Sequence, residues 1–157
     1  MKIRDLTIKD FEQFNILMMG LHDHHVNSRP DIYNRIEKPT TSTAWDFEAM
    51  LQNKKSVLLG AEIDGDLAGI CVMTIREPSK NPCVVPRTRG YIDDICVNKE
   101  YRRCGIGTAL YNEAVRRAHQ LGADCVELMV WDFNRSALEF YRSLGMAVQS
   151  YIMEKKL

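Results

Sequence analysis

The hydrophobic and polar positions in the first third of the chain predict a strand followed by a helix. Positions 1–6 alternate as in a short strand, and Thr7 with Asp10 has the spacing of a capping box before apolar residues at helical spacing. From Gly20 to Thr43, polar residues and two prolines interrupt this pattern, so we expect irregular or short helical structure there. Residues 44–53 predict a short helix, which the preceding Thr and Ser residues can cap.

A hairpin is predicted in the middle of the chain. Two apolar-rich runs, 56–63 and 67–75, flank Asp64-Gly65-Asp66, which is typical of a tight turn. The next residues, 77–87, include three prolines. They predict a surface loop.

The second half of the chain predicts further strands and helices in turn. Strands are predicted at 90–97, 125–130 and 146–154, and helices at 105–121 and 134–144, each helix being followed by a glycine. No repeat, low-complexity tract or linker interrupts this order. The pattern predicts an α/β fold in which α and β elements are mixed throughout.

Length, charge and cysteine content narrow the class of protein. A chain of 157 residues can bury one apolar core, so we expect residues 1–157 to form a single domain. Its 21 basic and 21 acidic residues balance, which provides no bulk charge for binding nucleic acid or an anionic membrane. No apolar run resembles a signal core or a membrane span. The five cysteines, an odd number without a Cys-x-x-Cys pair, favour a reducing, cytoplasmic location.

Residues 97–108 carry the strongest chemical signal, because two glycines lie between a predicted strand and the first turn of a helix. The first N–H groups of a helix lack intrahelical partners and lie at the positive end of its dipole, so they can bind a phosphate. Arg102 and Arg103 add charged donors at the same place. The segment lacks the lysine of a Walker A loop and the third glycine of a dinucleotide fingerprint. A different pyrophosphate-bearing ligand is therefore predicted.

Three segments, in order along the chain, match one known pattern. They are Arg102-x-x-Gly105-x-Gly107, the strand at 91–97 and the helix at 134–146, which contains Asn-x-x-Ala-x-x-Phe-Tyr. The first is similar to the acyl-CoA signature of the GNAT superfamily of N-acetyltransferases, Gln/Arg-x-x-Gly-x-Gly/Ala. The other two resemble the central strand and the Asn-x-x-Ala-x-x-Phe-Tyr helix of that family.

This resemblance implies a fold and a cosubstrate. The implied GNAT-like fold is a central, mixed and mostly antiparallel sheet, flanked by helices, whose fourth and fifth strands splay apart. Acetyl-CoA is the implied acyl donor, with its pantetheine arm paired to strand backbone in the gap and its pyrophosphate on loop N–H groups. Carried over by position, the implied cofactor-binding residues are Ile95, Cys96, Val97, Arg102, Arg103, Cys104, Gly105, Ile106, Gly107, Thr108 and Asn134.

For two of these positions the expected role in cofactor binding needs a further remark. Asn134 is also a typical N-cap residue, so a helix cap is an alternative that is compatible with cofactor contact. Cys104 departs from the glycine or long polar residue that the family often has there. We expect only its backbone to matter.

Candidates for the chemistry lie on the central strand and on the last helix. Tyr141 matches the tyrosine that many of these enzymes place beside the CoA sulfur, where a phenol can act as general acid; a core aromatic is the alternative. For the base we prefer Asp93, acting directly or through a water, on the same strand face as Tyr91, where the family sometimes carries its base. A bulge in this strand would exchange Asp93 for Asp94.

The sequence defines the acceptor side only by position. In the resemblance the N-terminal region lines that side, so His24, His25, Asp46 and the 77–88 loop are candidates for the amine pocket. The histidine spacing, His22 included, does not match a zinc site, and we assign no metal.

The resulting functional hypothesis is transfer of an acetyl group from acetyl-CoA to a primary amine by direct attack in a ternary complex. A small-molecule amine is preferred. The alternatives are a protein N-terminus or lysine as acceptor and, from another class, a non-catalytic acyl-CoA sensor. A 77–88 loop folded over the site would favour a small molecule, and an open groove would favour a peptide. A homodimer is compatible with each of these.

Overall fold

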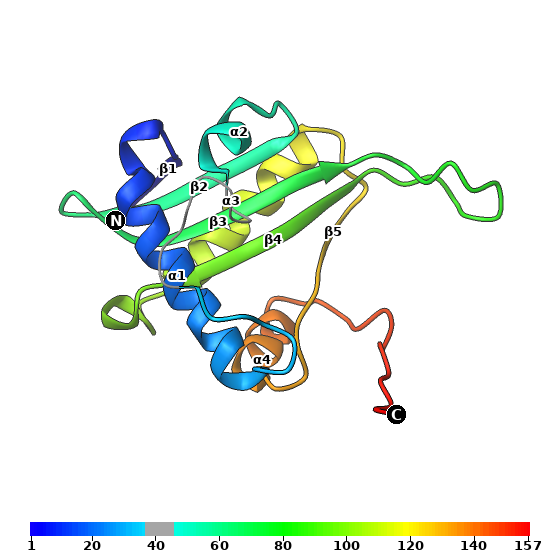
Figure 1. Cartoon of the computed structure of the whole chain (residues 1–157). Coiled ribbons are helices and arrows are strands. Elements are labelled where there is room, and N and C mark those ends of the chain that lie inside the picture. The colour runs from blue at the N-terminus through cyan, green and yellow to red at the C-terminus, as the bar shows by residue number, and fades with distance from the viewer. Residues whose placement is uncertain (37–45) are drawn as a thin grey trace.

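The computed structural model describes residues 1–36 and 46–157, which form a five-stranded sheet with helices on both faces (Figure 1). The strands lie in chain order, β1 (Lys2–Asp5), β2 (Ser56–Ile63), β3 (Asp66–Arg76), β4 (Arg89–Val97) and β5 (Cys125–Leu128). Neighbours are antiparallel except for the parallel pair β4 and β5. The helices are η1 (Ile8–Asp10), α1 (Phe11–Ser28), α2 (Phe47–Gln52), η2 (Lys99–Tyr101), α3 (Ile106–Gln120) and α4 (Arg135–Ser143).

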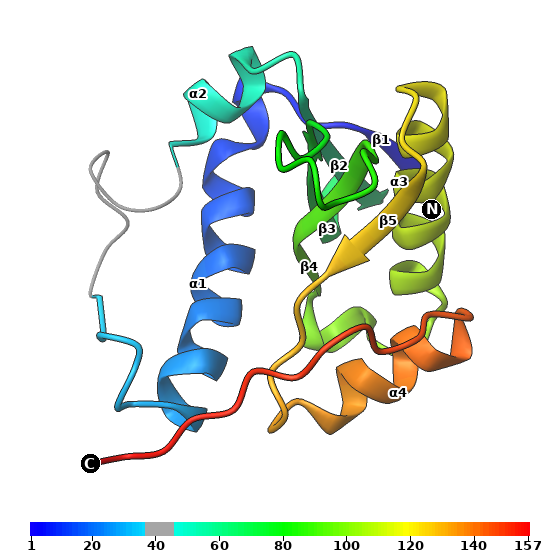
Figure 2. The same cartoon turned by 90° about the vertical axis from the view of Figure 1, so that its right-hand side faces the viewer.

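Two apolar layers hold the helices on the sheet. Figure 2 shows α1 and α2 on one face and α3 on the other. The α3 layer includes the fully buried Leu59, Met73, Ile106 and Leu110. The layer under α1 and α2 includes the fully buried Phe14, Met18, Phe47 and Ile70. Burying both faces explains why β2 and β3 are almost continuously apolar in sequence.

The predicted hairpin and the capping box both form. The turn between β2 and β3 consists of Asp64 and Gly65, with φ angles of 51° and 94°, which suit a tight two-residue connection. At the start of α1, the Asp10 carboxylate accepts a hydrogen bond from the Thr7 backbone N–H at 2.7 Å. Arg4 donates two more hydrogen bonds to Asp10, and these lower the pKa of this buried carboxyl to about 2.

Helix α1 is longer than predicted, because it continues through Gly20 to Ser28. A glycine inside a helix costs only about 1 kcal/mol, and burial of Val26 in the last turns outweighs such a penalty. The helix ends where Arg29 precedes Pro30, since the residue before a proline disfavours helical backbone. No helix within residues 1–36 and 46–157 is long and apolar enough to cross a membrane.

Helix α2 begins at Phe47 within the described residues. Asp46 caps it, with its carboxylate accepting a hydrogen bond from the Ala49 N–H at 3.0 Å. The predicted interruption at Lys38-Pro39, the Thr and Ser residues expected as caps and the predicted start at Ala44 lie outside the described residues.

The strand predicted at 146–154 is absent, and these residues form an extended segment instead. Tyr151, Ile152 and Met153 are 80%, 88% and 88% exposed, so the segment buries little of its apolar surface against the rest of the chain. Strand pattern alone does not make a strand, because each strand needs a neighbour to satisfy its backbone groups. The strand predicted at 125–130 does form, as β5, but ends at Leu128.

Gly69 offers a direct test of how tightly β3, β4 and α3 pack. A Cβ at this position would lie 2.9 Å from the Cys96 carbonyl oxygen and 3.2 Å from both Ile106 and Leu110. We expect Gly69→Ala to lower the free energy of unfolding by about 1–3 kcal/mol, because backbone cannot move aside as a flexible side chain can.

The matched control is Gly20→Ala, at a helix position where a Cβ would meet nothing within 4 Å. This variant should gain up to about 1 kcal/mol of stability through helix propensity. Urea unfolding of both variants measures the two effects. Equal stability of Gly69→Ala and the parent protein would contradict the described packing.

Candidate active site

β4 and β5 separate halfway along β4. Their parallel pairing runs from Arg89 opposite Cys125 to Ile92 opposite Leu128 and stops there. β4 continues to Val97, still paired with β3 on its other side, while the chain after β5 turns toward α4 (Figure 1). The last residues of β4 thus present an edge with no strand partner among the described residues. The predicted splaying of the fourth and fifth strands is confirmed.

A bulge in β4 lies where the two strands separate. Val72 of β3 pairs with Asp94, and the next residue, Met73, pairs with Ile92, so Asp93 is the extra residue. A bulge bends its strand and increases the local twist, which helps to turn the end of β4 away from β5. The bulge also brings Asp94 to the face of the sheet that carries Val72 and Thr74, so both carboxylates lie on that face.

Asp94 lies on the side of the sheet covered by α1. Its partner Val72 belongs to the apolar layer under that helix, and Cys96, two residues along the strand, packs against the same layer. Burial, followed by the nearby charge of Asp93, raises the pKa of Asp94 to about 6. This group therefore changes its protonation state close to neutral pH, as suits a general base.

Asp93 lies in a different setting. Its carboxylate accepts a hydrogen bond from the Thr74 hydroxyl at 2.7 Å and pairs with Arg76 at 3.2 Å. The same Arg76 guanidinium lies over the ring of Tyr91, 3.2 Å from its centroid. Asp93 and Tyr91, both considered for the base, are thus held by partners on the neighbouring strand.

Tyr141, the predicted acid, is buried on α4 and only 8% exposed. Its ring contacts those of Tyr111 on α3 and Phe140. Burial raises the pKa of Tyr141 well above its usual value, with a smaller contribution from the charge of Asp94. The phenol therefore keeps its proton at neutral pH and lies within electrostatic reach of Asp94.

The loop from η2 into α3 presents unpaired backbone donors. Arg103 and Gly105 have φ angles of 65° and 77°, and this left-handed backbone turns the chain into the helix. Gly105 is the N-cap of α3 and has no side chain that could accept a hydrogen bond. The first N–H groups of the helix therefore lack a side-chain cap. Arg102 donates from Nε to the Val97 carbonyl at 3.1 Å, which ties the loop to the end of β4.

Glycine is required at positions 105 and 107 for different structural reasons. A side chain at Gly105 would meet nothing within 4 Å, so that position is open and needs glycine only for its backbone conformation. A Cβ at Gly107 would lie 3.3 Å from the ring of Phe140, so this glycine lets α3 and α4 approach closely. The absence of a side chain at Gly107 therefore allows α4, the helix that carries Tyr141, to pack against the start of α3.

Asn134 and Cys104 lie as the sequence suggested. Asn134 is the N-cap of α4, and its side-chain oxygen accepts a hydrogen bond from the Ala137 N–H at 3.2 Å. Cys104 is exposed, and its thiol makes a weak contact at 3.6 Å with the carbonyl oxygen of Arg102. The cap on α4 explains why an asparagine is suitable there before any ligand is considered.

An aromatic cluster joins the end of α1 to the segment that leads into α4. Sequence reasoning missed this cluster. His25 stacks on Tyr33 at 5.1 Å and meets Phe133 edge-on at 6.1 Å, while His24 contacts Phe133 at 5.6 Å. Trp131 donates from its indole N–H to the Tyr33 hydroxyl at 2.7 Å. Burial lowers the pKa of His25, with a smaller contribution from the neighbouring His24. No local pattern joins residues about 100 positions apart.

The other two acceptor-side candidates lie apart from this cluster. Asp46 caps α2. The 77–88 loop is largely exposed and projects beyond the sheet at the start of β4, the end opposite the phosphate loop (Figure 1). The 77–88 loop does not fold back over the unpaired edge of β4.

A sheet whose parallel pair separates beside a glycine-rich helix start is the architecture of an acyl-CoA-dependent acetyltransferase. The chain belongs to the acetyltransferase (GNAT) family, whose family model matches residues 19–146. The predicted family and fold are confirmed.

Two relatives of known sequence place the chain within this family. An N-alpha-acetyltransferase of Sulfurisphaera tokodaii is 30% identical over 115 residues, which cover 71% of this chain and 69% of that protein. An uncharacterized N-acetyltransferase of Methanocaldococcus jannaschii, MJ1207, is 32% identical over 101 residues, or 64% of this chain. The chain spans only 43% of the length of MJ1207.

Solved structures share the whole fold. A single-site mutant of the BH1408 protein from Bacillus halodurans has a TM-score of 0.93 and 32% identity, and the match covers 100% of this chain and 99% of that one. Aminoglycoside N-acetyltransferase AAC(6')-Iy in complex with CoA has a TM-score of 0.74 at 17% identity, with 99% and 98% of the two chains covered. At that identity the likeness shows the fold alone.

The raised pKa of Asp94 predicts a pH-dependent effect of Asp94→Asn on stability. Because the folded state holds this proton more tightly than the unfolded state, the stabilisation is full below about pH 4 and is lost as the pH rises through about 6. Asp94→Asn should match the parent protein at pH 4 and exceed its free energy of unfolding by about 2 kcal/mol at pH 8.

Urea unfolding at the two pH values measures this difference, with Asp93→Asn as the neighbouring control. A constant difference between Asp94→Asn and the parent across this range would show that Asp94 titrates normally.

Proposed function

We propose that the protein transfers the acetyl group of acetyl-CoA to the primary amine of a small molecule, by direct attack in a ternary complex. The observation that carries this proposal is that Asp94, whose pKa is raised to about 6 at the end of the β4–β5 pairing, acts electrostatically on the buried, protonated Tyr141. One group can accept a proton and the other can donate one.

The cofactor seat follows from the unpaired backbone. We assign the pantetheine arm to the free edge at Ile95, Cys96 and Val97, where an extended amide chain can pair as a strand would. The pyrophosphate lies on the loop and first helical turn from Arg103 to Thr108, at the positive end of α3. Arg102 shapes this loop through its contact with Val97, and Asn134 contacts the cofactor from the start of α4.

In this proposal Asp94 replaces Asp93 as the base. The bulge leaves Asp94 half-buried beside Val72, whereas Asp93 is held by Thr74 and Arg76. Asp94 takes a proton from the acceptor ammonium, and the neutral amine attacks the thioester carbonyl. Tyr141 then donates its hydroxyl proton to the departing CoA sulfur, and the proton released from the newly acetylated nitrogen restores the phenol.

A peptide N-terminus is the second candidate acceptor. The 77–88 loop projects away from the unpaired β4 edge, which leaves the acceptor side open to an extended chain (Figure 1). The Sulfurisphaera relative is named an N-alpha-acetyltransferase, whereas other relatives are named for ornithine and thialysine acetylation. We place this activity in one cytoplasmic domain, in keeping with the five free cysteines.

Thr108 provides a test of the pyrophosphate seat without disturbing the fold. It is exposed in the first turn of α3, where a negative charge favours the helix dipole but repels a phosphate. We expect Thr108→Glu to keep its stability and to weaken acetyl-CoA binding at least tenfold, while Thr108→Gln binds nearly as the parent does. Isothermal titration of the three proteins with acetyl-CoA measures these affinities. Equal affinities would contradict the assignment of the pyrophosphate to this loop.

Turnover of the matched pair Asp94→Asn and Asp93→Asn tests the assignment of the base. We expect Asp94→Asn to lose about 100-fold or more in kcat and to lose the basic rise of the pH profile near 6, with Asp93→Asn within a few-fold of the parent. Tyr141→Phe should bind acetyl-CoA normally and lose turnover by a similar factor.

The assay follows CoA release with polyamines, amino acids, aminoglycosides and N-terminal peptides as acceptors. If Asp93→Asn is the variant that fails, the base is Asp93. Turnover with peptides alone would establish the second candidate, and binding without turnover of any amine would indicate a sensor.

A further inference from the structure

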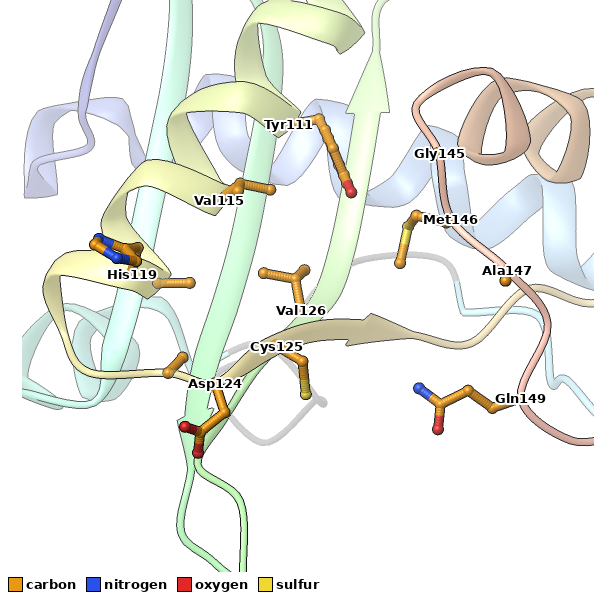
Figure 3. A pocket seen from close by; sticks show the side chains of 12 residues that line it. Tyr111, Val115, His119, Asp124, Cys125, Val126, Gly145, Met146, Ala147 and Gln149 are labelled. Carbon is orange, nitrogen blue, oxygen red and sulfur yellow. The ribbon is translucent and has the colours of Figure 1, made fainter.

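The acceptor has to reach Asp94 from the α1 side of the sheet. Figure 3 shows a groove of about 480 Å³ between α3, β5 and the chain after α4, lined by Tyr111, Val115 and Val126 among others. These three residues belong to the α3 layer, on the opposite side of the sheet from Asp94. The groove therefore does not lead to the proposed base, and the groups that hold the acceptor are those on the face that Asp94 shares.

That face of the sheet is polar at this point. On β3, Thr74 and Arg76 follow the partner of Asp94 at every second position, so their side chains lie on the same face as Asp94. Tyr91 of β4 pairs with Thr74 and lies on this face too. The side chains of Arg76 and Asp93 are 42% and 30% exposed. A small molecule that approaches Asp94 from solvent therefore meets these side chains as well.

Arg76 is held in one position on this face. Its guanidinium lies over the ring of Tyr91, 3.2 Å from the centroid, and its Nη2 donates to the Asp93 carboxylate at 3.2 Å. Asp93 is fixed in turn by the Thr74 hydroxyl at 2.7 Å. A guanidinium that its neighbours already orient loses less conformational freedom on binding a ligand than an unrestrained side chain does.

The hydrogen-bonding capacity left over beside Asp94 is that of a donor. Within the described residues, Asp93 has the partners just given, and Glu127 on β5 pairs with Arg89 at 3.4 Å. Arg76 donates a single hydrogen bond there, and a guanidinium has further N–H groups to donate. This face therefore offers a ligand a positive charge with spare donors, which favours an anionic group over a second ammonium.

We propose that Arg76 binds a carboxylate of the acceptor, so that the acceptor is an amino acid whose reacting amine reaches Asp94. This inference rests on the proposed function, in which Asp94 is the base. Adjacent Cα atoms are about 3.8 Å apart, so an arginine tied to Asp93 and a base at Asp94 can serve two ends of one small molecule. The planar guanidinium can donate parallel hydrogen bonds to the two oxygens of a carboxylate.

This assignment separates an amino acid from the other candidate acceptors. A polyamine or an aminoglycoside brings further ammonium groups next to a guanidinium that repels them. A peptide N-terminus has an amide where a free amino acid has its carboxylate, so it gains no ion pair with Arg76. In this proposal Arg76 determines specificity and takes no part in proton transfer.

Amino acids and their carboxamides test the inference, because each pair differs in the charge that Arg76 would bind. The panel is glycine, β-alanine, ornithine and lysine with the matching amides, followed through CoA release. For at least one pair we expect the parent protein to favour the acid in kcat/KM. Arg76→Gln should lower that ratio of acid to amide about tenfold, mainly through the KM of the acid, as loss of a charge-assisted hydrogen bond predicts.

Two further variants serve as controls. Arg89→Gln removes the same charge from the position paired with Arg76 on β4, and it should keep the ratio within about twofold, since Arg89 is engaged with Glu127. Arg76→Lys keeps the charge without the planar group and should restore part of the preference.

The outcomes distinguish this inference from the function on which it rests. Turnover of acids and amides with the same ratio in the parent protein and in Arg76→Gln would overturn the role of Arg76 and leave the proposed function standing. An equal loss of preference in Arg89→Gln would also overturn it, because bulk charge would then explain the effect. Binding of acetyl-CoA without turnover of any amine would overturn both.

Discussion

The separation of β4 from β5 is the constraint on which the rest of the site depends. Pairing ends at Ile92 and Leu128, next to the bulge at Asp93, and leaves the last residues of β4 with backbone groups that the sheet does not use. Unpaired backbone in the middle of a fold is costly unless a ligand or solvent satisfies it. In the proposed function, a bound extended amide chain would meet this requirement and would direct the cofactor to the start of α3.

The proposed chemistry also depends on the bulge in β4. It leaves Asp94 half-buried and Asp93 in contact with Thr74 and Arg76, so two adjacent carboxyl groups differ in burial and partners. Above about pH 6 the charged Asp94 carboxylate lowers the free energy of unfolding. Such a cost is common where a residue is retained for function. The close approach of Gly107 to Phe140 meanwhile holds α4, and with it Tyr141, against the same opening.

Local sequence signals predicted most of the fold, including the glycine-rich start of α3. The hairpin at Asp64-Gly65 and the helix start at Gly105 were predictable because turn and cap chemistry is encoded within a few residues. The length of α1 was not, since tertiary burial of Val26 overrides the glycine and polar residues before it. The strand predicted at 146–154 did not form, because strand formation depends on a partner that sequence alone does not supply.

Within the site, the limits of prediction have the same origin. One extra residue in a strand exchanges the two faces, so the choice between Asp93 and Asp94 required the register of β4 against β3. The aromatic cluster around His25 and Trp131 joins distant segments and has no local signature. Family resemblance located Tyr141, whose burial the periodicity of its helix alone did not establish.

The most direct test of this account is a titration of ¹⁵N-labelled protein with acetyl-CoA, followed through its backbone amide resonances. The account predicts the largest shifts at the free β4 edge, from Ile95 to Val97, and in the loop and helix start from Arg103 to Thr108. Shifts confined to other parts of the protein, or saturating binding that leaves the β4 edge unchanged, would contradict the claim that the opening between β4 and β5 holds the cofactor.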